Sequence, residues 1–437
     1  MTSETRRFLV GLGAIVAVGL VVRLAFMLLA HHPYDPHGDA LVYHAGANDL
    51  AEGKGFVLAF FLENGEQQQA ASNPPLYLIW LAIPSLFGLD SPLAHQLWSF
   101  VLGLGTIVVI GFLARKLAGN RAGLIAAAIA AIGPNFFYWD TVILAETMSL
   151  LAASAVVYLA YRAWQSPDTK RLVLLGAACG AAALARAELT LLVPLVVVPL
   201  ALGRKTVDRG ARVRRLAAAG LAALIVVTPW IAYNATRFEK TVLLSNGLGV
   251  TLAATQCDTA FYGELTGLWS VDCSLKVQRT FPKGFDESQR DAAYRDAAFE
   301  YLGDHLDRFP VVVLARWTRA LGIYDLGYTL KFEQFPEGRD KTIAYTGMLS
   351  VWILGILSFF GVRELRRRKI PVYPLVALPV IAMIAIAIAF ASARYRSTAE
   401  PALAVLGAIA IDAFIRRGRG EADQPEGALV DAGAASS

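Results

Sequence analysis

Residues 8–30 read FLVGLGAIVAVGLVVRLAFMLLA, and this apolar run with the polar segment after it decides the fold. The run is long enough to cross the hydrocarbon core of a bilayer. It lacks a small-residue cleavage pattern at its end, so we expect a first membrane helix rather than a cleaved signal. Residues 37–44, HGDALVYH, then place acidic and imidazole side chains where the chain leaves the membrane. This segment is the first candidate for chemistry.

The composition indicates a membrane protein. Of the 437 residues, 56% are hydrophobic and only 17% are charged, which is too little polar surface for a soluble chain of this size. We therefore expect an all-α polytopic membrane protein with about ten transmembrane helices, interfacial helices and a small extracytoplasmic loop domain. The predicted spans are the apolar runs 8–30, 94–114, 122–138, 142–162, 172–187, 189–202, 216–234, 343–362, 372–392 and 399–415.

The basic residues predict the orientation. Lys and Arg collect in short loops that all fall on one face if the N-terminus is cytoplasmic. With an even number of spans, both termini are cytoplasmic and the loops 31–93 and 235–342 lie on the outer face of the plasma (inner) membrane. This topological role accounts for the net charge of +5, so we expect no nucleic-acid partner.

The predicted spans and loops divide the chain into four parts. Residues 1–234 form a transmembrane catalytic module with outer loop 31–93, and 235–342 form an extracytoplasmic loop with an interfacial helix. Residues 343–416 form the last membrane helices, and 417–437 form a disordered cytoplasmic tail.

Helix signals are also present in the outer loops. Residues 39–52 predict a short helix that ends at the glycines after it, and residues 75–88 predict a helix in the membrane interface. In the second loop, residues 235–285 look irregular, residues 286–308 predict a polar helix, and residues 311–324 predict an interfacial helix.

Asp39 has two interpretations. A Gly-Asp pair before an apolar-periodic stretch is a common helix start, so the carboxylate can serve as an N-cap. A carboxylate at the outer membrane face also suits a general base that takes a proton from an acceptor hydroxyl. Its position beside His37 and His44 favours the catalytic interpretation.

Histidines and aspartates are dense around Asp39. Their residue types are compatible with a metal site, but their spacing matches no established metal signature, so a solvated or structural cluster is favoured. We assign no metal ligand and expect no certain cofactor, with a divalent metal as the open alternative. The cluster comprises His31, His32, Asp35, His37, Asp39 and His44.

Glu146 and Arg186 are ionisable groups near the outer ends of predicted spans. An ionisable residue there indicates function by default. The alternative for Glu146 is a packing partner for an Arg from another span. Arg186 can pair with Glu188 or bind a lipid phosphate.

Arg394, Tyr395 and Arg396 lie in a tight outer turn before the last span. Two guanidiniums there can neutralise and bidentately bind a phosphate as it leaves. The alternative is anchoring to lipid headgroups.

The three cysteines divide into two groups. Cys257 and Cys273 share an outer loop, and an oxidising compartment predicts a disulfide between them. Cys179 lies in a span and is expected to be a small buried residue.

Several short motifs resemble one family. Asp39-x-x-x-Tyr43 and the motif Asn73-Pro74-Pro75-Leu76-Tyr77 look like the first external loop of GT-C glycosyltransferases. They resemble in particular the branch of protein O-mannosyltransferases and the lipid A aminoarabinose transferase. The segment around Glu146 and the Arg394-Tyr395-Arg396 turn resemble further motifs of that superfamily. The loop around Cys257 and Cys273 looks like that of actinobacterial members.

The resemblance implies the site roles. It implies that Asp39 is the catalytic base with Glu146 in support, that Arg186, Arg394, Tyr395 and Arg396 bind the donor phosphate, and that His37 and Tyr43 contact substrate. Protein mannosyltransferases carry a paired Asp-Glu where this chain has Asp39-Ala40. A protein acceptor is therefore not favoured.

The expected function is transfer of a sugar from a polyprenyl-phosphate donor to a hydroxyl acceptor, on a glycan, lipid or protein of the cell envelope. The sequence has no nucleotide-binding loop, so the donor comes from the lipid bilayer itself. Two rivals remain, a lipid-linked sugar flippase and a cell-wall polymerase. Inverted repeats would indicate a transporter, and none is evident.

Overall fold

The computed structural model describes residues 2–30, 34–58, 67–166, 168–203, 208–335 and 338–420. Nearly all regular structure in these ranges is helical, and the one β-type pairing there is an isolated antiparallel bridge between Val57 and Gln69. The all-α prediction is confirmed.

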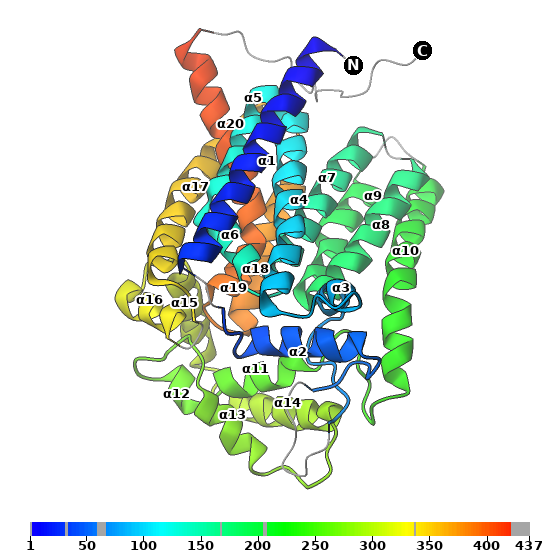
Figure 1. Ribbon diagram of the computed structural model, residues 1–437, viewed down its shortest axis with the longest axis vertical. Coiled ribbons are helices and arrows are strands. Elements are labelled where there is room, and N and C mark those ends of the chain that lie inside the picture. The colour runs from blue at the N-terminus through cyan, green and yellow to red at the C-terminus, as the bar shows by residue number, and fades with distance from the viewer. Residues whose placement is uncertain are drawn as a thin grey trace.

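Long helices run side by side along the longest axis of the molecule (Figure 1). This bundle consists of α1 (Ser3–Ala30), α4 (Pro92–Ala118), α5 (Asn120–Ile132), α6 (Pro134–Thr141), α7 (Glu146–Gln165), α8 (Thr169–Ala185), α9 (Val198–Leu202), α10 (Arg209–Ala235), α17 (Lys341–Arg367), α18 (Tyr373–Ile388), α19 (Ala393–Arg396) and α20 (Glu400–Gly418).

Shorter helices gather at one end of the bundle (Figure 1). They are α2 (Asp39–Ala51), α3 (Leu76–Ser85), α11 (Gly247–Thr255), α12 (Asp258–Phe261), α13 (Val271–Gln278), α14 (Glu287–Asp304), α15 (Phe309–Ala320) and α16 (Leu326–Gln334). The start of α1 and the end of α20 lie at the opposite end. The two long loops therefore share one end of the molecule, as the topology prediction requires.

Five of the described helices are long and apolar enough to cross a membrane, namely α1, α4, α10, α17 and the segment Ala393–Gly418. A sixth span is added if α5 and α6, which meet at a bend of 49°, count as one. The predicted count of ten is not confirmed. Residues 187–202 are broken into 3-10, π and short α segments, and α18 has only 16 residues.

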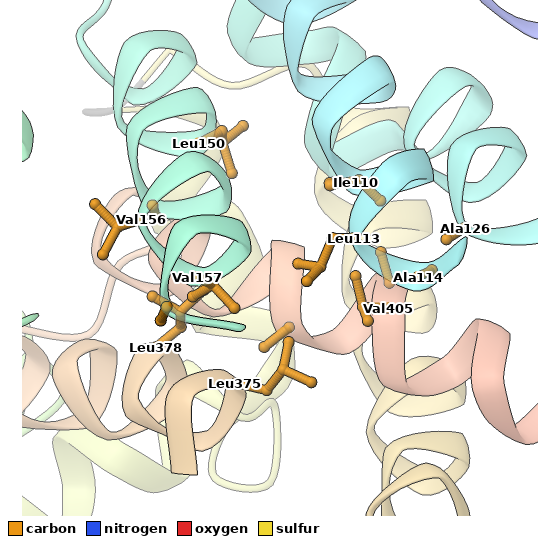
Figure 2. Close-up of a cluster of buried hydrophobic side chains, with 14 of the residues drawn as sticks. Ile110, Leu113, Ala114, Ala126, Leu150, Val156, Val157, Leu375, Leu378 and Val405 are labelled. Carbon is orange, nitrogen blue, oxygen red and sulfur yellow. The ribbon is translucent and has the colours of Figure 1, made fainter. Parts of the chain in front are cut away.

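The bundle core is built from alanines and branched side chains. Figure 2 shows Ile110 and Leu113 of α4 facing Val157 of α7, Leu378 of α18 and Val405 of α20. Small residues let membrane helices approach closely. The core therefore joins early and late helices of the chain into one body that can hold the mouth of the bundle in place.

The second loop is more ordered than its sequence suggests. Residues 235–285 were expected to be irregular, and that prediction is wrong, because α11, α12 and α13 lie within them. The polar helix is present as α14 and begins with a capping box in which Asp286 accepts from the backbone of Gln289. Cys257 and Cys273, which were expected to pair, are joined by a disulfide. Cys179 is buried, as expected.

Candidate active site

Four charged side chains meet at the mouth of the bundle beneath α2. Asp39 is the first residue of α2, Glu146 is the first residue of α7, Arg186 directly follows α8, and Arg394 lies in α19. Their positions span most of the sequence. The fold therefore brings together residues that only tertiary structure can make neighbours.

Arg394 links the two acidic residues. Its Nη1 donates to Asp39 Oδ2 at 2.7 Å, and its Nε donates to Glu146 Oε1, also at 2.7 Å. Arg186 donates from Nη1 to the same Glu146 oxygen at 2.6 Å, and from Nε to Glu188 Oε1 at 2.5 Å. The result is a continuous chain of ion pairs from Asp39 to Glu188.

Side-chain exposure falls from Asp39 through Arg394 to Glu146, and it rises slightly again at Arg186 and Glu188, which are 11% and 16% exposed. The Asp39 side chain is 47% exposed and Arg394 is 24% exposed, whereas Glu146 is fully buried. A buried carboxylate is stable only when it is paired, and Glu146 has two guanidiniums on one oxygen. Its other oxygen, Oε2, accepts no hydrogen bond from the described residues. Glu146 is therefore a fixed anchor inside the chain of ion pairs, and the Asp39 end is accessible.

Helix ends explain how the acidic residues are positioned. Asp39 and Glu146 both lie in a first helical turn, where the helix dipole favours a negative charge. The N-cap of α2 is Gly38, with φ of 56° and no side-chain capping bond. Asp39 is thus not the cap. Its carboxylate reaches Arg394 instead.

The structure separates Arg396 from Arg394. Arg396 is 4% exposed and donates to the carbonyl oxygen of Ala320 at 2.7 Å. In a helix, residues two apart point to different faces, and α19 is helical here. The two guanidiniums therefore do not lie together, and their expected joint binding of one phosphate stays a prediction. Tyr395 lies on the Arg186 side, with that guanidinium 5.5 Å from its ring centre.

His37 and Tyr43 have different surroundings. His37 is exposed, and its Nδ1 lies 3.2 Å from the carbonyl oxygen of Asp35. Tyr43 is 2% exposed and packs edge-on against Tyr77 at 5.1 Å. Burial, with the negative charges of Glu146 and Asp39, raises the pKa of Tyr43 above its usual value. Its phenol therefore stays neutral and holds α2 against the bundle.

In the part of the chain that the structure describes, no three His, Cys, Asp or Glu side chains come together as metal ligands. His31 and His32 of the predicted cluster lie outside the described residues. His44 faces away from Asp39 toward His95, with their Nδ1 atoms 3.0 Å apart.

A buried ion pair next to the site was missed by the sequence analysis. Arg23 Nε donates to Asp140 Oδ2 at 2.6 Å, with both side chains 1% exposed. Thr147, next to Glu146, also donates to Asp140. The signal was present, because Arg23 is a lone cation in the first apolar run and such a residue needs a partner. This pair fixes the start of α7 and with it Glu146.

Comparisons with known proteins agree with this architecture. Residues 72–233 match the family model described as dolichyl-phosphate-mannose-protein mannosyltransferase. This match includes Glu146 and Arg186 but neither Asp39 nor Arg394. No curated protein matches the sequence.

Solved structures of an oligosaccharyltransferase from Archaeoglobus fulgidus are similar over nearly the whole chain. One, archaeal AglB with an inhibitory peptide and a dolichol-phosphate, has a TM-score of 0.57 at 14% identity and covers 97% of this chain and 53% of its own. Another, tethered to an acceptor peptide, has a TM-score of 0.56 at 13% identity, with 94% and 50% covered. A third, with Zn and sulfate, has a TM-score of 0.54 at 12% identity, with the same coverage.

The chain spans about half the length of these solved chains. The similarity covers 97% of this chain in one of these structures and 94% in the other two, so it concerns the fold as a whole. The actinobacterial subtype is not confirmed. The fold is thus similar to that of the archaeal oligosaccharyltransferase, and residues 72–233 match the mannosyltransferase family model.

Proposed function

We propose that the chain transfers a sugar from a polyprenyl-phosphate donor to a hydroxyl acceptor at the mouth of the bundle. The observation that carries the proposal is the chain of ion pairs in which Arg394 joins an accessible Asp39 to a buried Glu146. It supplies a carboxylate for proton transfer and guanidiniums for a phosphate within one hydrogen-bonded unit. The titles of the similar solved structures name a dolichol-phosphate and an acceptor peptide, which supports this class of donor.

In the proposed reaction, the donor phosphate takes the place of Asp39 on Arg394. Asp39 is then released to accept the proton of the acceptor hydroxyl. The hydroxyl oxygen forms a bond to the anomeric carbon as the bond from that carbon to the phosphate oxygen breaks. Polyprenyl phosphate leaves as an anion held by Arg394, with Arg186 nearby. Direct displacement inverts the anomeric configuration.

Glu146 positions the two arginines. Because its Oε1 accepts from both Arg186 and Arg394, it fixes the distance between the guanidiniums before substrate binds. Preorganised charges of this kind stabilise a transition state more than mobile charges do, since they need no rearrangement during the reaction.

The proposed face is extracytoplasmic. Basic residues collect at the end of the bundle that holds the start of α1 and the end of α20, and such residues favour the cytoplasm. The Asp39 cluster lies at the other end. The acceptor is then a hydroxyl of a cell-envelope glycan, lipid or protein.

A divalent metal has no step in this proposal. Among the residues that the structure describes, no three candidate ligands come together. Addition and removal of Mg²⁺ and Mn²⁺ in the assay below tests whether transfer also needs a metal.

The test uses the purified full chain in detergent with lipid-linked sugars extracted from its host and a crude envelope acceptor fraction. Mass spectrometry measures free polyprenyl phosphate. We expect release by the wild type and a loss of about a hundredfold or more in Asp39→Asn, the size of a general-base contribution.

Asp90→Asn is the matched control, because Asp90 is an exposed carboxylate at the same mouth whose described contact is made by its backbone carbonyl. Its release should equal that of the wild type. If the wild type binds the lipid but releases no polyprenyl phosphate with any acceptor fraction, the transferase proposal is wrong and a flippase replaces it.

A further inference from the structure

A pocket lies at the end of the bundle opposite the candidate active site. It has a volume of 280 Å³ and is formed by the last turns of α17 and α20, toward the end that also holds the start of α1 (Figure 1). None of the residues proposed for sugar transfer lines this pocket, so the pocket is considered separately.

The polar half of the pocket carries excess positive charge. Arg363, Arg367 and Arg417 line it, together with the single carboxylate of Glu364. Glu364 is 2% exposed and already accepts from Arg417 at 3.2 Å and from Arg368 at 2.8 Å. The Arg363 side chain forms no hydrogen bond or ion pair with the described part of the chain. Within the lining, three guanidiniums therefore face one carboxylate, to which Arg367 also donates at 3.4 Å, and this balance of charge suits an anion.

The other half of the pocket is apolar and faces outward. Phe360 and Phe414 line it, are 38% and 41% exposed, and lie with ring centres 5.4 Å apart. Both belong to segments that are long and apolar enough to span a membrane. Exposed rings on such helices face hydrocarbon rather than water.

We propose that this pocket binds one anionic phospholipid, with the headgroup phosphate on Arg363, Arg367 and Arg417 and an acyl chain against Phe360 and Phe414. Guanidinium groups bind phosphate oxygens bidentately, and basic pockets between membrane helices recognise anionic headgroups. A soluble phosphate compound would leave the apolar half without a partner, so the observations favour a lipid. The proposal goes beyond the proposed function and does not depend on it.

The test compares two charge-matched double variants of the full chain, purified and reconstituted in phosphatidylcholine or in an equimolar mixture with phosphatidylglycerol. Arg363→Gln with Arg417→Gln removes two lining cations. Arg366→Gln with Arg419→Gln removes two cations from the same helix ends outside the pocket lining. Native mass spectrometry counts retained phosphatidylglycerol, and circular dichroism confirms that each variant is folded.

We expect the wild type and the control variant to retain one phosphatidylglycerol in preference to phosphatidylcholine, and the pocket variant to bind it about tenfold more weakly or worse. Equal retention by both variants overturns the proposal, as does equal retention of both lipids by the wild type. Displacement of the lipid by glycerol phosphate at equal concentration would show a soluble-anion site instead, and would also overturn it.

Discussion

Arg394 and Arg396 are two residues apart in the sequence but belong to different parts of the molecule. Arg394 bonds to Asp39 and Glu146, whereas Arg396 is buried against Ala320. The sequence motif alone groups them, because it does not show that the turn is helical and sends the side chains apart. The motif therefore pointed to Arg394 as a candidate site residue, but it did not show that Arg396 is buried elsewhere.

These two arginines should respond differently to the same substitution. Arg394→Lys keeps the charge but cannot donate in the two directions that Asp39 and Glu146 require. We expect polyprenyl phosphate release to fall about a hundredfold, with little change in melting temperature. Arg396→Lys should lower the melting temperature, because the new side chain does not reproduce a buried contact. Polyprenyl phosphate release and the melting temperature in detergent are measured for each of the two variants.

Arg279→Lys is the control for this pair, since Arg279 is exposed and directly follows the loop helix α13 at the same end of the molecule. It should change neither quantity. An Arg394→Lys variant with wild-type release would remove Arg394 from the proposed machinery.

At the scale of elements, helix positions were largely predictable and helix interruptions were not. Apolar runs located α1, α4, α10 and α17, since a span must satisfy its own backbone hydrogen bonds. The break of residues 187–202 into short segments depends on neighbouring helices that the local sequence does not reveal. The short helices α11 to α13 were missed for the same reason, because they form where other segments cover them.

The contact of α17 with α20 gives a prediction at this scale. A Cβ at Gly361 would lie 2.2 Å from the Leu406 carbonyl oxygen of α20, whereas a Cβ at Gly355 meets nothing within 4 Å. We expect Gly361→Ala to destabilise the protein by about 1–3 kcal/mol through overpacking. Gly355→Ala on the same helix should be neutral or slightly stabilising. Thermal unfolding of both variants in one detergent checks this, and equal melting temperatures would mean that the two helices are not in close contact.

For the whole molecule, the sequence predicted the all-α membrane class but not which distant side chains meet. The positive charge of the short loops and the positions of the two long loops can be read directly from the order of residues in the chain. The four charged side chains of the candidate site meet only when the helices pack, because the core in Figure 2 must first join α4, α7, α18 and α20. These side chains are Asp39, Glu146, Arg186 and Arg394. The motifs pointed to each of these residues separately, and the structure shows the ion pairs that join them.

The proposed orientation predicts a labelling pattern. Glu4→Cys lies at the start of α1 and Lys283→Cys lies in the second loop, and both positions are exposed. In intact cells, a membrane-impermeant maleimide should label Lys283→Cys and should label Glu4→Cys only after permeabilisation. The native cysteines should not interfere, because Cys257 and Cys273 form a disulfide and Cys179 is buried. The reverse pattern would place the candidate active site in the cytoplasm.

Once the donor sugar is known, a single-turnover reaction tests the central claim most directly. The purified full chain is mixed with the lipid-linked sugar and acceptor, and polyprenyl phosphate and glycosylated acceptor are quantified together, with the anomeric configuration read by NMR. We expect equal amounts of both products, an inverted configuration, and formation of both products about a hundredfold slower or less in Asp39→Asn. Polyprenyl phosphate formed without glycosylated acceptor, or a retained configuration, would contradict direct transfer at the Asp39–Arg394–Glu146 cluster.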